Sequence, residues 1–194
     1  RAALVRPAFW LIVLAFSIHW FVSAGVSMHG LGMFQERGMS REAALGLMTF
    51  IGPAQVAGRL ALMLLRPAAS GRVIGRILWI ALSAALGAFA LMGPASFGAF
   101  VAFAILYGAA SGVLIIARLT VVAELFGVRG YGAISGAIST AAIAARTGAP
   151  LTLAVVHDYF GGYDEIATVM ACLALIGAAA FFAATARPAH PASQ

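Results

Sequence analysis

Six apolar runs separated by short polar stretches make up most of the chain. They cover about residues 7–33, 41–65, 73–92, 97–122, 131–156 and 166–186. A helix rises about 1.5 Å per residue, so a run of about 20 apolar residues crosses the hydrocarbon core of a bilayer. The pattern predicts an all-α integral membrane bundle in which one domain, residues 1–194, carries six transmembrane helices.

Composition supports a membrane protein and narrows its class. The chain is 63% hydrophobic and only 9% charged, whereas soluble domains carry about 25% charged residues. The net charge of +6 comes from arginines that lie between apolar runs, which indicates membrane topology rather than nucleic-acid binding. A single cysteine, Cys172, and scattered histidines predict neither a disulfide framework nor a metal site. Because the chain begins at Arg1, we expect it to be part of a longer protein. We also expect it to need no cofactor.

The arginines alternate between the two sides of the predicted bundle. One side, which includes both termini, would carry nine of them, and the other side only Arg37 and Arg41. The nine are Arg1, Arg6, Arg59, Arg66, Arg72, Arg76, Arg118, Arg129 and Arg187. Cytoplasmic loops are rich in basic residues, so both termini are predicted to be cytoplasmic.

Arg146 is the most informative polar residue, because it lies near the middle of the fifth run. An arginine at this depth costs at least about 2.5–3.5 kcal/mol and needs a partner, water or a function. At helical spacing, Ser135, Ser139 and Pro150 share its side of the helix. The stripe predicts that Arg146 lines a path and binds a carboxylate. The alternative is a structural arginine bound to helix carbonyls near Pro150.

Other polar residues have weaker patterns. Gln55 and Arg59 are four residues apart and share a helix face; Arg59 would bind an anion or extend its side chain toward the interface. His19, four residues before Ser23, would relay protons or pack as a neutral ring beside Trp20, with Ser23 or water as its hydrogen-bond partner.

Three further residues have simpler interpretations. His29 lies near the outer surface and is predicted to be a gating or interfacial residue. His157 is predicted to lie in an interfacial loop. Arg118 and Glu124 are predicted to pair at the cytoplasmic end of the fourth run.

The fourth run contains two further short patterns. Gly108 and Gly112 have the spacing of closely packed membrane helices. Ser111 precedes Gly112 as the serine does in rhomboid proteases, but residues 164–186 contain no histidine to activate it. We therefore expect Ser111 to be a packing residue and the protein not to be an enzyme.

Several segments, taken in order, resemble the C-terminal half of a major facilitator superfamily transporter, especially the bacterial branch similar to monocarboxylate porters. They are GVSMH at 25–29, ERGMS at 36–40 with AA at 43–44, GPAQVAGRL at 52–60, ELFG at 124–127, YGAISG at 131–136, GAP at 148–150 and DYFGGYD at 158–164. The resemblance covers nearly the whole chain. One departure is the missing Asp of the family's acidic-basic loop signature, which would fall between Gly58 and Arg76.

The resemblance implies that the six spans correspond to the seventh to twelfth helices of a twelve-helix fold. The partner would be an N-terminal six-helix half of the same protein, and both halves would lie in a bacterial inner membrane. The implied function is secondary active transport of a small organic anion by alternating access. Arg59 matches the anion-handling arginine of monocarboxylate porters, whereas Gln55 stands where they carry a proton-binding acid.

The predicted site therefore comprises Arg146, Arg59, Gln55, His19, Ser139 and Ser23, with His29 as a gate and without a metal. The coupling ion stays open, with a proton as one candidate. Two alternative functions also stay open. One is efflux of hydrophobic or cationic compounds, and the other is a six-span membrane protein that transports nothing.

Overall fold

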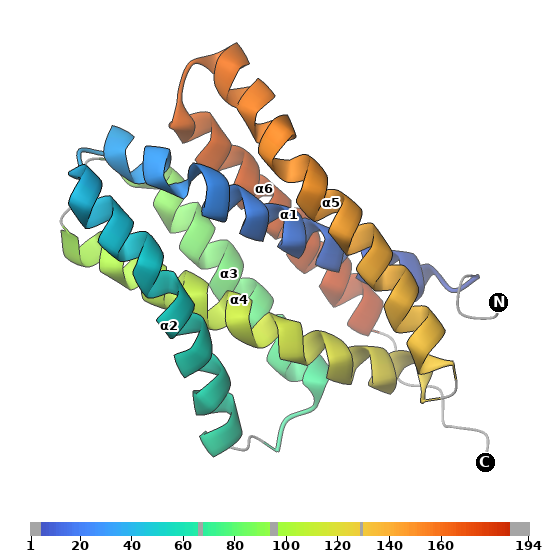
Figure 1. Ribbon diagram of the computed structural model, residues 1–194. Coiled ribbons are helices and arrows are strands. Elements are labelled where there is room, and N and C mark those ends of the chain that lie inside the picture. Colours follow the sequence, from blue (N-terminus) through green and yellow to red (C-terminus); the bar gives the residue numbers. More distant parts are fainter. Residues whose placement is uncertain (1–4, 66–67, 94–96, 129, 187–194) are drawn as a thin grey trace.

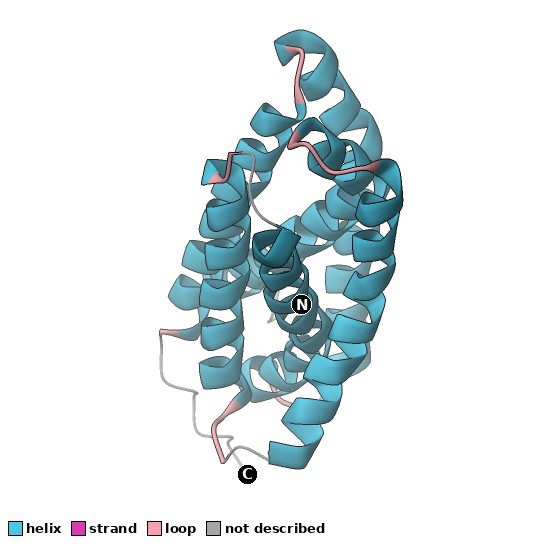
Figure 2. Ribbon diagram, turned by 90° about the vertical axis from the view of Figure 1, so that its left-hand side faces the viewer, coloured by secondary structure: helices cyan, strands magenta, loops and turns pink. Residues whose placement is uncertain are grey.

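The computed structural model describes residues 5–65, 68–93, 97–128 and 130–186, and these residues form six α-helices and no strand. The helices are α1 (Pro7–Glu36), α2 (Arg41–Leu65), α3 (Gly71–Leu91), α4 (Phe97–Phe126), α5 (Tyr131–Phe160) and α6 (Tyr163–Thr185). The predicted all-α class is confirmed, and Figure 2 shows the helices running along one long bundle. Arg1, Arg66, Arg129 and Arg187 of the orientation prediction lie outside the described residues.

Each of these six helices is long and apolar enough to cross a membrane. Successive helices run in opposite directions, so α1 begins and α6 ends at the same end of the bundle (Figure 1). The chain is therefore a multi-pass membrane protein.

Several helices extend beyond their apolar runs. α4 continues to Phe126 and α5 to Phe160, and each ends one residue before a glycine with positive φ, Gly127 (77°) and Gly161 (81°). A glycine in this conformation ends a helix without strain, whatever the polarity of the preceding turn. The loop prediction for His157 is therefore wrong, because His157 lies in the last turn of α5.

The helices form two layers. α3 and α6 pack against each other, and they also pack against α4 and α1, respectively. α3 and α6 form the back layer in Figure 1. In front of them lie α1, α2, α4 and α5, which we call the front helices. α2 packs mainly on α4, and α5 mainly on α1. The four front helices therefore share one face of the bundle.

The packing repeats after three helices. α2 packs on α4 as α5 packs on α1, and α3 packs on α4 as α6 packs on α1. α1 and α4, which start the two triplets, run in opposite directions. The helices α1–α3 and α4–α6 therefore have the arrangement of two inverted repeats.

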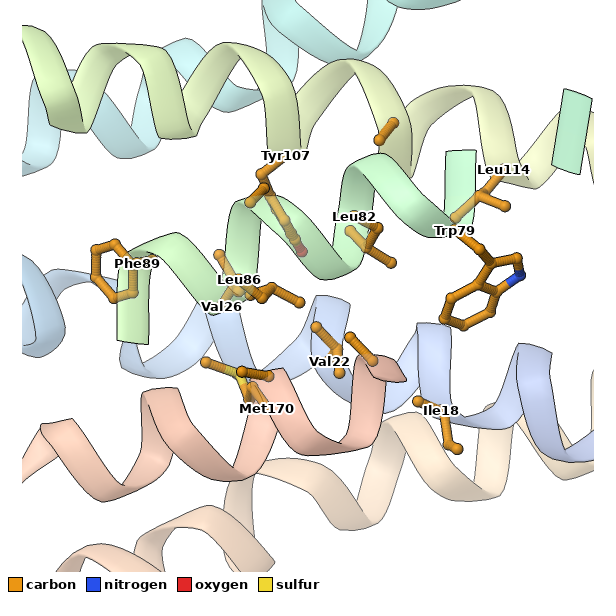
Figure 3. Close-up of a cluster of buried hydrophobic side chains, with 14 of the residues drawn as sticks. Ile18, Val22, Val26, Trp79, Leu82, Leu86, Phe89, Tyr107, Leu114 and Met170 are labelled. Atoms are coloured by element: carbon orange, nitrogen blue, oxygen red, sulfur yellow. The ribbon is translucent and has the colours of Figure 1, made fainter. Parts of the chain in front are cut away.

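The core lies between α1, α3, α4 and α6. Figure 3 shows Trp79 and Leu82 of α3 converging with Val22 of α1, Leu114 of α4 and Met170 of α6. All five side chains are at most 1% exposed. This packing fixes α1 and α4 in place, so the polar residues on their front sides have fixed positions.

α2 and α4 approach each other closely through small residues. A side chain on Gly112 would lie 2.6 Å from the carbonyl oxygen of Gln55, and one on Gly108 would lie 2.7 Å from Ala54 Cβ. A side chain on Gly58 of α2 would likewise lie 2.8 Å from the backbone of Ala109. The close packing predicted from Gly108 and Gly112 is confirmed.

Charged side chains tie the helix ends together. At one end of the bundle, Arg37 Nε donates to the Met92 carbonyl (3.0 Å), and its Nη2 lies 2.6 Å from Asp164 Oδ1. At the other end, Glu124 Oε1 accepts the Gly71 N–H (2.7 Å), and Glu124 Oε2 lies 3.6 Å from Arg72 Nε. Glu124 of α4 therefore places a carboxylate beside the start of α3, next to the segment between Gly58 and Arg76 in which the family's Asp is missing.

Candidate functional site

Three adjoining hollows lie on the face formed by the front helices. Their volumes are about 240, 250 and 260 Å³. The first and second share Ser23 and Ser27, and the second and third share Arg146. They therefore lie next to one another across α1, from α2 to α5, and we call the three hollows together the polar trough.

Arg146 lies where the second and third hollows meet. Its side chain is exposed, and its guanidinium carbon lies 5.0 Å from the centre of the Trp20 ring of α1. Within the described residues it forms no ion pair and no hydrogen bond with a helix carbonyl. The stacking on Trp20 orients the guanidinium and leaves its N–H donors available to a ligand.

Arg118 lines the same hollow as Arg146, and the prediction that it pairs with Glu124 is wrong. Its Nη1 donates to Ser139 Oγ at 3.0 Å. Arg118 and Glu124 are six positions apart, which places them on different sides of α4, and Glu124 instead binds the start of α3. Because α4 continues to Phe126, Arg118 lies two turns inside the helix.

The end of the trough near α5, where Arg118 and Arg146 lie, is electropositive. The chain has six acids, and they lie at or near helix ends as Glu36, Glu42, Glu124, Asp158, Asp164 and Glu165. None of them lines the three hollows. Two guanidinium groups from different helices therefore share one hollow without a carboxylate, as a binding site for an anion requires.

The end of the trough near α2 is polar but uncharged. Ser23, Ser27, Gln55 and Tyr107 line it together with apolar residues of α1 and α2. Tyr107 comes from α4, where its ring is 2% exposed, and its hydroxyl lies within reach of Ser23 and Ser111. Hydroxyl and amide groups both donate and accept hydrogen bonds, so this end can bind neutral polar groups.

His19 lies behind the trough rather than in it. The side chain is 2% exposed and packs between Trp20 and Trp79. Its Nε2 lies 3.1 Å from Ser111 Oγ, and its Nδ1 has no partner among the described residues. The packed histidine expected beside Trp20 is therefore present, but Ser111 replaces Ser23 as its partner.

Ser111 and His19 are in hydrogen-bond contact, as a catalytic serine and its base are. Such a pair needs hydrogen-bond contact and also room for a substrate carbonyl. Both residues are 2% exposed, and neither lines a hollow of the trough. Ser111 was predicted only to pack closely, and it also contacts His19. Both side chains are too buried for a substrate to reach them.

Arg59 and His29 line none of the three hollows. Arg59 Nε donates to the carbonyl of Gly112 at 3.1 Å, which ties α2 to α4. His29 Nε2 lies 3.2 Å from the carbonyl oxygen of Pro150, which ties α1 to α5. The anion-binding role of Arg59 and the gating role of His29 stay predictions.

The structure thus brings together four of the predicted site residues: Ser23, Gln55, Ser139 and Arg146. It adds residues that sequence patterns missed: Trp20, Ser27, Tyr107, Arg118 and Thr147. The sequence held a signal for Arg118 alone, since it precedes Phe126 by two helical turns. The others have side chains that are common in ordinary helix packing.

Comparisons with known proteins add no family to this description. No protein-family model matches the chain, and no curated protein matches it either. The assignment of function therefore depends on the geometry of the polar trough and of the helices around it.

Proposed function

We propose that this chain is one six-helix unit of a secondary transporter of the major facilitator type, and that it carries a small organic anion. A second six-helix unit of the same protein would cover the polar trough. The substrate would lie between the two units, which rock to expose it to one side of the membrane and then to the other.

The polar trough is the observation that carries this proposal. Hydrocarbon does not solvate guanidinium, amide and hydroxyl groups, so a membrane protein keeps such groups against protein or a water-filled cavity. Arg118 and Arg146 lie in a hollow of about 260 Å³ on the front side of the bundle. A covering unit with water between the two surfaces meets this requirement.

The arrangement of the helices is a second, independent support. Inverted repeats of three helices recur within each half of major facilitator transporters. The packing of α1–α3 and α4–α6 has this form. α2 and α5, the second helices of the two triplets, are both continuous, and each contains one internal proline, Pro53 and Pro150.

The charges favour an anionic substrate over a cationic one. Arg118 and Arg146 line the trough, and none of the acids does so. A guanidinium binds a carboxylate through two parallel N–H donors, and this interaction is stronger away from bulk water. Efflux of a cation would require an acid in the trough, which would have to come from the covering unit.

The proposed location is a bacterial inner membrane with both termini cytoplasmic. The bias of arginines toward one side of the bundle supports this orientation. Lipid would contact the apolar outer surface, which includes Leu64, Ile77, Ile80 and Leu175.

Transport by the complete protein in proteoliposomes tests the proposal. The assay would compare uptake of a panel of carboxylates and an organic cation by the wild type, Arg118→Ala, Arg146→Ala, Arg59→Ala and the exposed control Arg41→Ala. We expect saturable carboxylate uptake whose kcat/KM falls about tenfold or more in Arg118→Ala and Arg146→Ala and stays within about twofold in Arg41→Ala.

Two outcomes would contradict the proposal. One is transport of the cation alone, and the other is unchanged carboxylate kinetics in both Arg118→Ala and Arg146→Ala. Normal transport by Arg59→Ala would restrict the role of Arg59 to the contact between α2 and α4.

A further inference from the structure

The polar trough is longer than a simple carboxylate needs. The hollows at its two ends both border α1, at Trp20 in one and Ser27 in the other. These residues are seven positions apart, which corresponds to about 10 Å along the helix. A carboxylate held between Arg118 and Arg146 therefore leaves the α2 end of the trough for the rest of the ligand.

The α2 end has the chemistry of a site for hydroxyl groups. Ser23, Ser27, Tyr107 and Gln55 come from three helices and present hydroxyl or amide groups to one hollow. None of them carries a charge at neutral pH, so this end discriminates by hydrogen bonds. A hydrocarbon tail placed there would displace water from the half-buried Ser23 and Gln55 side chains without replacing its hydrogen bonds, which is costly.

We propose that the ligand of the trough is a polyhydroxylated carboxylate of the sugar-acid class. Its carboxylate is held by Arg118 and Arg146, and its hydroxyl groups bind Gln55, Ser23 and Ser27. This inference rests on the proposed function, because it names the substrate class of the same site.

Binding to the complete purified protein distinguishes the two ends of the trough. Three probes divide the chemistry: gluconate has a carboxylate and hydroxyl groups, hexanoate has the same carbon chain without hydroxyl groups, and glucitol has hydroxyl groups without a charge. We expect gluconate to bind about tenfold or more tightly than hexanoate, since several hydrogen bonds distinguish them. Glucitol should bind more weakly than gluconate by a similar factor.

Variants then assign the difference to residues. Gln55→Leu and Ser27→Ala should each weaken gluconate binding about 3- to 10-fold and leave hexanoate within about twofold. Ser27 is exposed and its replacement is small, so this variant keeps the test valid even if Gln55→Leu impairs folding. Gln35→Leu and Thr49→Val are matched controls, since both residues are exposed and line none of the hollows.

The outcomes separate this inference from the proposed function. If hexanoate binds as tightly as gluconate while Arg146→Ala weakens both, the hydroxyl site is wrong and the anion site stands. If no carboxylate binds, or if Arg118→Ala and Arg146→Ala bind as the wild type does, both fail. If Gln55→Leu and Ser27→Ala leave gluconate affinity unchanged in protein that is folded, the assignment to the α2 end is wrong.

Discussion

Arg146 and Arg118 reach one hollow from neighbouring helices, and each is oriented by a contact that leaves donors available. Trp20 lies under the Arg146 guanidinium, and Ser139 accepts one N–H of Arg118. Side chains held in this way lose less entropy when a ligand binds. The contacts of the two arginines therefore support the proposed carboxylate site.

Replacement of Trp20 tests this orientation. In Trp20→Leu, the Arg146 guanidinium loses its aromatic platform, which is worth about 0.5–2 kcal/mol. We expect carboxylate affinity, measured by isothermal titration calorimetry, to fall by about 2- to 30-fold. Trp10→Leu is the matched control, because Trp10 is 58% exposed and lines none of the hollows. An unchanged affinity in folded Trp20→Leu protein would remove Trp20 from the site.

Replacement of Ser139 tests the second contact. Ser139→Ala removes the acceptor of the Arg118 N–H, so Arg118 samples more conformations before it binds a ligand. A lost hydrogen bond to a charged group corresponds to about 1.5–3 kcal/mol, and part of it is recovered through water. We expect carboxylate affinity to fall severalfold, with Thr140→Val on the exposed side of α5 as a control. Equal losses in the two variants would show that the effect is not specific to Arg118.

Sequence patterns located part of this site because charge is costly inside a membrane. Arg146 lies so far inside an apolar run that its depth alone made it a candidate for the site. Arg118 was missed because the polar residue after it, Glu124, suggested that the helix was ending there. The last turn of α4 is helical although it contains Glu124, and only the fold shows that Arg118 lies beside Ser139.

The pairs of helices have their own determinants. α2 contacts the bundle mainly through α4, and this contact depends on Gly58, Gly108 and Gly112. Association of helices in lipid depends on packing rather than on removal of apolar surface from water. Small residues at this contact therefore determine how precisely Gln55 is placed relative to the trough.

A matched pair of glycine substitutions tests the contact between α2 and α4. In Gly112→Ala, the new methyl group would lie 2.6 Å from the Gln55 carbonyl oxygen and 2.7 Å from its Cα, and both are backbone atoms. Overpacking of this kind costs about 1–3 kcal/mol. We expect a lower thermal unfolding temperature in detergent, while Gly46→Ala, which meets no atom within 4 Å, keeps the wild-type value or exceeds it. Equal unfolding temperatures would contradict the close approach.

The number and order of the helices were predictable, whereas their partners were not. Apolar length determines that a segment spans the membrane, and the six runs correspond to the six helices. Which helix packs on which depends on side chains far apart in the sequence, such as Trp79 against Gly177. The two layers and the triplets α1–α3 and α4–α6 are therefore results of the structure.

The whole molecule has two kinds of surface. Apolar side chains are exposed on all six helices, including Ile80 of α3 (57% exposed) and Leu175 of α6 (60% exposed). The front helices carry the polar trough. A membrane protein with this asymmetry places the apolar surface in lipid and the polar surface against protein and water. The proposed anion site depends most on this division between the surface in lipid and the surface that water reaches.

Thiol labelling in intact membranes measures the division directly. The complete protein would first carry Cys172→Ala, since the native cysteine is exposed. Single cysteines would then replace Ser139 and Thr147 in the trough and, as controls, Ile80 and Leu175 on the apolar surface. A charged, membrane-impermeant reagent modifies a thiol only where water reaches it.

The account predicts that Ser139→Cys and Thr147→Cys react with the reagent from one side of the membrane, and that a bound carboxylate slows both reactions. Ile80→Cys and Leu175→Cys should stay unmodified with and without the carboxylate. Modification of the Ile80 and Leu175 positions, with Ser139 and Thr147 left unmodified, would mean that the front face lies in lipid, and it would contradict the proposed anion site.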